Sequence, residues 1–237
     1  MATASLVWQE GGELRVADLA YDGETLIGRS DAAAVRLAER TVSREQAVIR
    51  FDGARFVVEN RSSTNPTQLA GMPVTEATPL PDAATVKVGT IELAFHNLSA
   101  GDRLSGPVCS HCGRENAAED RDCWYCGTSL VSAATTVRQR LQVICRVVSA
   151  SGEHWDLHPG RAMVLRADGT VALADPNDAL EPGSLRINLE GARLMARAAA
   201  DGESATVGGQ VPAADGVELH TGDRIDAGAA RFWVLVR

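Results

Sequence analysis

The stretch AVIRFDGARFVVEN, residues 47–60, decides the fold class of this chain. Two runs rich in branched and aromatic residues flank an Asp52-Gly53 pair, and such a pair between strand-like runs is a strong hairpin signal. Short apolar runs of the same kind recur through residues 1–98, whereas helical periodicity is limited to a weak candidate at residues 32–39. The sequence therefore predicts an all-β fold with the strand spacing of a sandwich.

The hairpin has a counterpart near the C-terminus. Shifts of 138 and then 139 residues superpose apolar residues and glycines, which set the core and the turns of a β fold. The superposed sets are residues 51–55 with 189–193, Gly71 with Gly209, Val86 with Ile225, and Gly89 with Gly228. We expect the two ends to carry the same β-sandwich fold; convergent strand patterning is the alternative.

Cysteines define a small module between the two ends. Two C-x-x-C pairs, each followed by a glycine, can present four sulfurs to a single tetrahedral ion. The spacing C-x2-C-x10-C-x2-C is formed by Cys109, Cys112, Cys123 and Cys126. The pattern resembles a zinc ribbon, which implies one structural Zn²⁺ that folds a segment with little core of its own. Disulfides are the competing interpretation, and Trp124 and Tyr125 are either a contact surface or a cover for the ion.

Bulk composition restricts the partners. The chain has 237 residues and a net charge of −8, so it lacks the basic field that broad binding to nucleic acid or anionic membranes requires. No apolar run is long enough to span a bilayer, and the N-terminus does not resemble a signal peptide. We expect a cytoplasmic protein, where disulfides are rare. An enzyme is not expected, because no nucleophile–base signature or P-loop is present.

Three polar loop motifs follow strand-like runs in the first domain. They are Gly28 with Arg29, Ser43 with Arg44, and Thr64 with Asn65. Their order and spacing over residues 5–97 resemble those of forkhead-associated (FHA) domains, β-sandwiches that bind phosphothreonine peptides. A threonine phosphate carries nearly two negative charges and three acceptor oxygens, which suits a guanidinium fork and several hydroxyl or N–H donors.

The FHA resemblance implies a role for each of these residues. Arg29 would bind phosphate oxygens, and Gly28 would allow close backbone approach. The hydroxyl and the N–H of Ser43 would donate to the phosphate, as would Thr64. Asn65 would bind the peptide backbone, and Arg44 would lie beside the peptide and influence the residue preferred downstream.

Three positions depart from the usual FHA pattern. Gln46 stands where the family usually has a histidine that braces the loops, and glutamine can also donate and accept hydrogen bonds. Pro66 replaces a common glycine, and Ala70-Gly71 replaces an Asn-Gly turn. We expect altered loop shapes with the phosphate contacts kept.

The C-terminal copy lacks the phosphate-binding residues. The repeat superposes Ser43 on Glu181, Thr64 on Gly202 and Asn65 on Glu203, and it places the first motif near Val164–Leu165–Arg166. Two carboxylates would repel a phosphate more than a lone arginine could compensate. We therefore expect a degenerate FHA-like domain that serves as a scaffold or docking face.

These observations predict a modular adaptor. The expected segments are an FHA domain at 1–98, a linker at 99–108, a zinc ribbon at 109–128, a linker at 129–140 and a degenerate FHA-like domain at 141–237. The expected partner is a phosphothreonine-containing protein or peptide in a Ser/Thr kinase pathway, and the alanine- and arginine-rich composition indicates a bacterium. The alternative is a phosphorylation-independent assembly protein. Capture of phosphorylated Thr135 or Thr136 by the first domain in the same chain is a further hypothesis.

Overall fold

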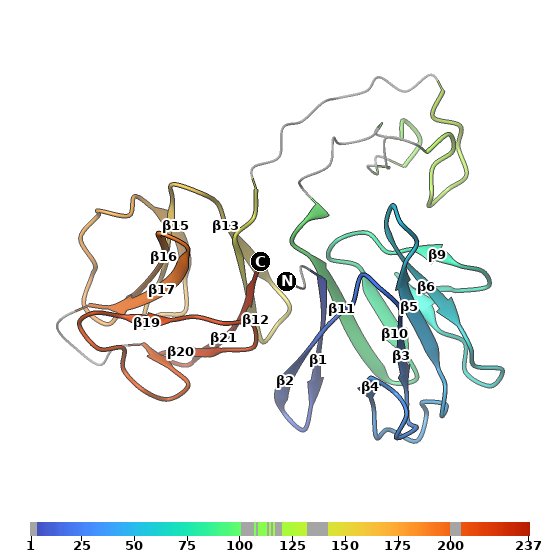
Figure 1. The fold of residues 1–237 in the computed structure, drawn as a ribbon, viewed down its shortest axis with the longest axis horizontal. Helices are drawn as coiled ribbons and strands as arrows, with labels where there is room; N and C mark the ends of the chain where they lie inside the picture. The colour runs from blue at the N-terminus through green and yellow to red at the C-terminus, as the bar shows by residue number, and fades with distance from the viewer. Residues whose placement is uncertain are drawn as a thin grey trace. The chain divides into compact units, whose positions relative to one another are not determined.

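The computed structural model describes residues 4–100, 107, 109–112, 114, 116, 120–131, 142–199 and 205–237. Every named element in this part of the chain is a β-strand (Figure 1), which confirms the predicted all-β fold. The chain forms two compact units, one consisting of Met1–Leu98 with Val143–Arg237 and the other of Ser99–Gln142. No helix among the described residues has the length and apolar character to cross a membrane.

The N-terminal sandwich consists of two sheets. The first has the strand order β2-β1-β11-β10-β7-β8 and the second has the order β4-β3-β5-β6-β9. The strands are β1 (Ala4–Glu10), β2 (Glu13–Asp18), β3 (Glu24–Gly28), β4 (Val35–Arg36), β5 (Ala47–Phe51), β6 (Phe56–Asn60), β7 (Gln68–Leu69), β8 (Met72–Pro73), β9 (Thr78–Pro79), β10 (Thr85–Val88) and β11 (Ile91–Asn97).

The stretch at 47–60 forms the expected hairpin in the second sheet. Phe51 lies opposite Phe56 in its register, and the Asp52 carboxylate caps the turn by accepting the N–H groups of Ala54 (2.9 Å) and Arg55 (2.8 Å). Alternation along β5 and β6 turns one set of side chains into the core between the sheets, where Phe56 packs edge-on against Phe51. The hairpin thus supplies both a turn and part of the core.

The C-terminal sandwich also consists of two sheets. Their strand orders are β13-β12-β21-β20-β18 and β15-β14-β16-β17-β19. The strands are β12 (Cys145–Ser149), β13 (His154–Leu157), β14 (Ala162–Leu165), β15 (Val171–Ala174), β16 (Leu185–Glu190), β17 (Arg193–Ala198), β18 (Thr206–Val207), β19 (Val217–Glu218), β20 (Arg224–Ala227) and β21 (Ala230–Val236).

The two sandwiches have the same strand order except at β8, which has no counterpart among the named strands of the C-terminal sandwich. In the first, Ile49 lies opposite Val58; in the second, Ile187 lies opposite Ala196, and both partners are 138 residues further along. The β10–β11 and β20–β21 hairpins correspond with a shift of 139 residues. The strand pairing therefore matches the repeat found in the sequence. The edge strand differs, because β4 runs parallel to β3 whereas β15 runs antiparallel to β14.

Candidate functional site

The loops after β3 and before β5 are held together by their backbones. The N–H of Arg29 donates to the carbonyl of Ser43 (2.9 Å), and the N–H of Ser30 donates to the carbonyl of Arg44 (3.1 Å). Gly28 is required at this crossing, because a Cβ atom there would lie 2.2 Å from the Arg44 carbonyl oxygen. The first two predicted motifs therefore adjoin each other through direct hydrogen bonds.

Gln46 connects these loops to the loop after β6. Its side chain is fully buried, and its Oε1 accepts the N–H of Ser43 (2.9 Å). Its Nε2 donates to the carbonyl of Asn65 (2.7 Å) and to Oγ1 of Thr67 (3.2 Å). The structure thus confirms that glutamine can brace the loops in place of the expected histidine.

Ser62 is a central residue that the sequence did not single out. Its Oγ lies 2.8 Å from Oγ of Ser43 and accepts the N–H groups of Thr64 (3.3 Å) and Asn65 (3.1 Å). It is 7% exposed. Ser62 therefore brings the second and third predicted motifs together. The neighbouring Ser63 carries the same hydroxyl group, so the sequence held no signal that could separate the two.

The outer rim of this cluster is polar and exposed. Nε of Arg29 donates to the carbonyl of Val42 (3.3 Å), which holds the guanidinium beside the backbone that leads into Ser43. Nδ2 of Asn65 donates to the carbonyl of Thr41 (2.8 Å). Arg29, Arg44, Thr64 and Asn65 are exposed. Hydroxyl groups and a cation therefore meet at one rim, which is suitable for binding an anion with several oxygens.

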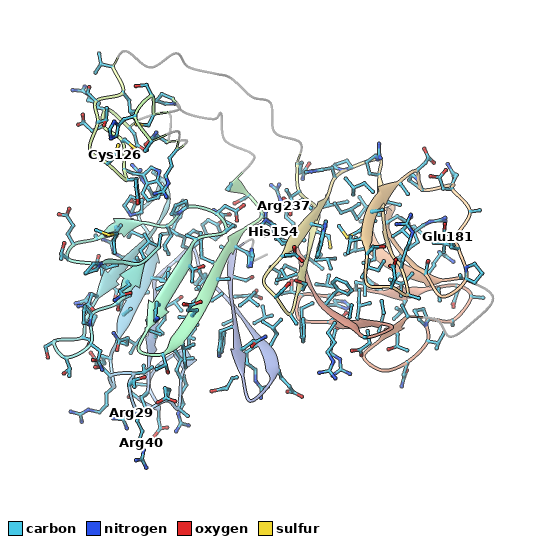
Figure 2. All side chains as sticks on the ribbon, turned by 180° about the vertical axis from the view of Figure 1, so that it is seen from behind. Arg29, Arg40, Cys126, His154, Glu181 and Arg237 are labelled. Carbon is cyan, nitrogen blue, oxygen red and sulfur yellow. The ribbon has the colours of Figure 1, made fainter. Side chains whose placement is uncertain are left out.

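Arginine side chains point outward at this end of the sandwich. Figure 2 shows Arg29 and Arg40 at the same end of the N-terminal sandwich. Within the described part of the chain, neither these two arginines nor Arg44 forms an ion pair with a carboxylate. No carboxylate among the described residues therefore neutralises these charges, which can attract an anionic ligand.

The corresponding rim of the C-terminal sandwich is different. Ile27 lies opposite Ala47 and Leu165 lies opposite Leu185, so the register places Arg166 at the position of Gly28. The sequence superposition had instead placed Leu165 there. Nε of Arg166 lies 3.3 Å from Oε2 of Glu181, the residue superposed on Ser43. The arginine charge is thus engaged by a carboxylate. Gly202 and Glu203, which complete this comparison, lie outside the described residues, as do Thr135 and Thr136.

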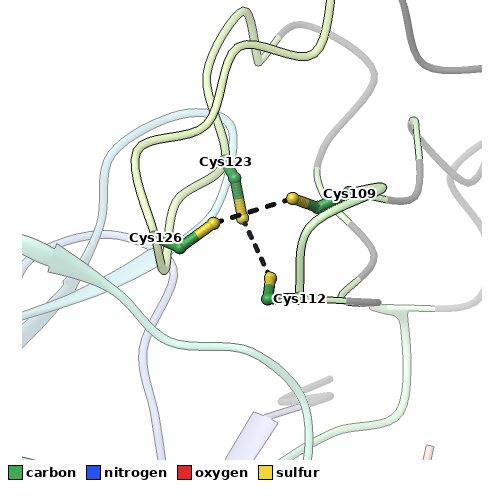
Figure 3. A group of neighbouring side chains, drawn as sticks. All are labelled: Cys109, Cys112, Cys123 and Cys126. Atoms are coloured by element: carbon green, nitrogen blue, oxygen red, sulfur yellow. Dashed lines mark hydrogen bonds between the residues drawn. The ribbon is translucent and has the colours of Figure 1, made fainter.

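The four predicted cysteine ligands converge in the unit Ser99–Gln142 (Figure 3). Their sulfur atoms all lie within 4.8 Å of one another. The Sγ atoms of Cys109 and Cys126 are 3.6 Å apart, as are those of Cys112 and Cys123. A tetrahedral ion with Zn–S bonds of ~2.3 Å needs sulfur separations of about 3.8 Å. The donor set therefore fits a Zn²⁺ ion in both geometry and chemistry.

Local backbone contacts shape the two cysteine turns. The N–H of Cys109 donates to the carbonyl of Arg114 (2.8 Å), and the N–H of Cys123 donates to the carbonyl of Thr128 (2.7 Å). Gly127 has φ of 69°, as a tight turn after a knuckle requires; Gly113 lies outside the described residues. Sγ of Cys126 lies 3.2 Å from Oγ1 of Thr128, within hydrogen-bonding distance.

The aromatic pair of this unit packs against an arginine. The guanidinium carbon of Arg114 lies 3.3 Å from the ring centroid of Tyr125 and 5.5 Å from that of Trp124. Tyr125 remains 44% exposed. This stacking places the rings beside a knuckle and leaves part of Tyr125 available to solvent.

Comparison with known families and structures identifies one domain. The model of the FHA domain family matches residues 25–89. An FHA domain solved for a structural and functional analysis of phosphothreonine-dependent FHA domain interactions is 30% identical, with 39% of this chain and 94% of that chain covered and a TM-score of 0.36. The FhaA FHA domain, complexed with the intracellular domain of Rv3910, is 30% identical over 39% of this chain and 99% of that chain, with a TM-score of 0.36.

A third solved structure is Mycobacterium tuberculosis Rv1747 FHA-1, which is 28% identical over 40% of this chain and 98% of that chain, with a TM-score of 0.34. A comparison with curated proteins finds no match. The matched residues include the loops of the first two predicted motifs and the loop that contains Ser62. Residues 25–89 of this chain therefore form an FHA domain, and through this domain the chain belongs to the FHA family.

Proposed function

We propose that the protein is a phosphothreonine-dependent adaptor and that its N-terminal FHA domain recognises the phosphopeptide. One observation carries the proposal: three separate loops of an FHA domain converge on the linked hydroxyl groups of Ser43 and Ser62, 2.8 Å apart, beside the exposed Arg29. A rigid sandwich that presents such loops offers a largely preformed site.

Each predicted residue has a place in this proposal. Arg29 supplies a permanent positive charge and a planar fork for two phosphate oxygens. Ser43 and Thr64 supply hydroxyl donors, and Ser62 holds the Ser43 hydroxyl and the backbone N–H of Thr64. Gly28 permits the close crossing of the loops. Asn65 contacts the backbone of the bound peptide, and Arg44 contacts residues downstream of the phosphothreonine.

We propose that the C-terminal sandwich is a degenerate FHA-like domain without phosphate binding. Its strand order supports the relationship, and the pairing of Arg166 with Glu181 supports the loss of the site. A phosphate would have to compete with a carboxylate that already holds the arginine. This domain therefore acts through its surfaces as a scaffold.

We propose that Cys109, Cys112, Cys123 and Cys126 hold one structural Zn²⁺ ion. The separation of their sulfurs and the four-thiolate donor set support this assignment. Four protein ligands would fill a tetrahedral shell, so the ion would stabilise the fold of the unit and would not bind a reacting water.

The proposed partner is a protein phosphorylated on threonine by a Ser/Thr kinase, and the proposed location is the cytoplasm. Solved relatives support the partner class, because one was studied for phosphothreonine-dependent interactions and another is complexed with an intracellular domain.

A phosphothreonine peptide library tests the proposal. Wild-type protein should bind selected phosphorylated peptides and not their bare forms, and Arg29→Ala should weaken binding roughly 10- to 100-fold, because it removes a charge-assisted contact of about 1.5–3 kcal/mol. Arg50→Ala is a matched control, because Arg50 pairs with Glu59 (2.7 Å) on the sheet away from the rim loops. Equal affinity for phosphorylated and bare peptides would instead support phosphorylation-independent assembly.

A further inference from the structure

Besides the two sandwich cores, the larger unit contains a third apolar cluster. It combines residues from both sandwiches, with Leu14 and Val16 partly buried against it. Its buried members are Val7, Leu98, Val143, Val148 and Leu235, each at most 7% exposed. Val7 lies on β1, and Val148 and Leu235 lie on β12 and β21. One sheet of each sandwich therefore buries its outer face against the other sandwich.

A buried arginine crosses the same face. The Arg146 side chain is 3% exposed and makes paired hydrogen bonds to Asp156 of its own sandwich, at 2.6 and 2.9 Å. It makes a second pair to Asp82 of the N-terminal sandwich, at 2.8 and 2.9 Å, and its Nη1 lies 3.1 Å from Nδ1 of His96. Because a buried guanidinium needs charged partners, these contacts fix which surfaces meet.

The two contributing faces are equivalent in the repeat. Val7 lies opposite Val16 in the first sandwich, and Val148 lies opposite His154 in the second. The hairpin register also makes His96 equivalent to Leu235. Val7 and Val148 both lie in the interface cluster, and the His96 and His154 rings are in contact with centroids 5.6 Å apart. The same surface patch of each copy therefore meets the other, as in the isologous interface of a two-fold dimer.

The charged contact breaks this symmetry. The residue equivalent to Arg146 is Ser5, which donates to Asp18 (2.9 Å) just as Arg146 bonds Asp156. The residue equivalent to Asp82 is Thr221. Asp82 accepts the N–H of Asn97 (2.8 Å), and Thr221 accepts the N–H of Val236 (2.9 Å). A pair of two N-terminal sandwiches would have no counterpart of Arg146, and a pair of two C-terminal sandwiches would have no counterpart of Asp82.

We infer that the outer face of the sheet containing β1 in the N-terminal sandwich is a docking surface whose partner is the C-terminal sandwich of the same chain. We also infer that the Arg146–Asp82 pair favours the pairing of an N-terminal with a C-terminal sandwich. Only an N-terminal sandwich paired with a C-terminal sandwich can form this contact, so the contact favours that pairing over a pairing of two identical sandwiches. The docked face shares no residue with the exposed rim formed by Arg29, Arg44 and Thr64. The phosphopeptide site therefore remains open while the sandwiches stay docked.

A cleavable form of the full chain tests the inference. A recognition sequence for a site-specific protease is inserted after Thr136, and the purified protein is cut and passed over a sizing column with light scattering. The cut halves of the wild type should migrate as one species with the mass of the intact chain. Separation of the wild-type halves would overturn the inference.

Substitutions then test the selecting pair. Arg146→Ser and Asp82→Thr give each sandwich the residue that the other copy naturally carries, and a threonine in place of the aspartate can still cap the Asn97 N–H. Each should weaken association of the cut halves by roughly tenfold or more, with folded sandwiches verified by circular dichroism. Arg193→Ala is the control, because Arg193 is 72% exposed and pairs with Glu218 at 3.8 Å. Association that is unchanged by both substitutions would overturn the role of the pair.

Discussion

At the residue scale, a few buried polar side chains set the geometry of the rim. Gln46 and Ser62 carry no predicted ligand contact, yet they join the loops that do. A polar group buried with its partners present holds one loop arrangement, and the same group becomes costly when a partner is removed. The shape of the proposed phosphopeptide site therefore depends on residues behind it.

Gln46→Leu is expected to destabilise the protein and weaken phosphopeptide binding. The substitution leaves the Ser43 N–H and the Asn65 carbonyl without their partner, at about 1–3 kcal/mol for each group. Urea unfolding and peptide titration measure the two effects. Gln46→His, which restores a donor and an acceptor, should recover most of both. Unchanged binding by the leucine variant would show that the loops keep their positions without this brace.

At the element scale, turns explain why much of the fold was predictable. The 47–60 hairpin and the repeated strand order follow from alternation and turn residues, which are local signals. The loop motifs were located, but Ser62 was not separable from Ser63 because burial depends on the folded loop. Arg146 was also missed, because the sequence alone does not distinguish an arginine that is buried in the folded chain from one that is exposed.

The β7–β8 hairpin contains a strained residue. Its two-residue turn is Ala70-Gly71, with φ of 49° and 83°, a turn that favours Asn-Gly. Because alanine is disfavoured in the left-handed region, Ala70→Asn should stabilise the protein by about 0.5–1 kcal/mol. Thermal unfolding measures the gain. Ala38→Asn, at an exposed site without positive φ, is the control, and an equal gain there would contradict a turn-specific effect.

At the scale of the whole molecule, the cysteine unit and the pair of sandwiches are expected to be stabilised by different features. The cysteine unit Ser99–Gln142 is compact by itself, whereas the sandwiches share one unit through their docked faces. We therefore expect removal of the proposed ion to affect the cysteine unit, and acid to affect the docked sandwiches.

Removal of zinc should unfold the cysteine unit alone. Metal analysis of protein purified under reducing conditions should give about one zinc per chain. A strong chelator should then make the segment around Cys109–Cys126 sensitive to protease, because the unit has little apolar core. The calorimetric transition of the sandwiches should keep its midpoint. Metal-free protein with an equally resistant segment would contradict a structural ion.

Acid should weaken the docked interface. Burial, followed by the adjacent Arg146 charge, lowers the pKa of His96 from 6.5 to about 4; Asp82, His154 and Asp156 also face it. The unfolded chain therefore binds a proton at His96 that the folded chain excludes. The contribution of neutral His96 to the free energy of unfolding is thus complete above pH 6.5 and is lost as the pH falls toward 4. The expected loss at pH 5 is about 2 kcal/mol.

Unfolding of wild type and His96→Leu between pH 8 and pH 5 measures this effect, with leucine chosen because Leu235 occupies the equivalent position. The pH dependence should be shallower in the variant. Asp82 responds in the same direction but at lower pH: burial would raise its pKa, yet the hydrogen bonds and charge of Arg146 lower it. An identical slope in both proteins would assign the acid sensitivity elsewhere.

The serine-to-arginine difference between positions 5 and 146 also has an evolutionary consequence. If the C-terminal sandwich is a degenerate copy, as proposed, loss of ligand binding would by itself leave its sequence free to change. Here its departure would strip the cover from valines and leucines of the surviving copy and leave Asp82 without its counter-charge. On this proposal, the residues of the docked face in the C-terminal sandwich should vary less among relatives than the loops that correspond to the N-terminal rim.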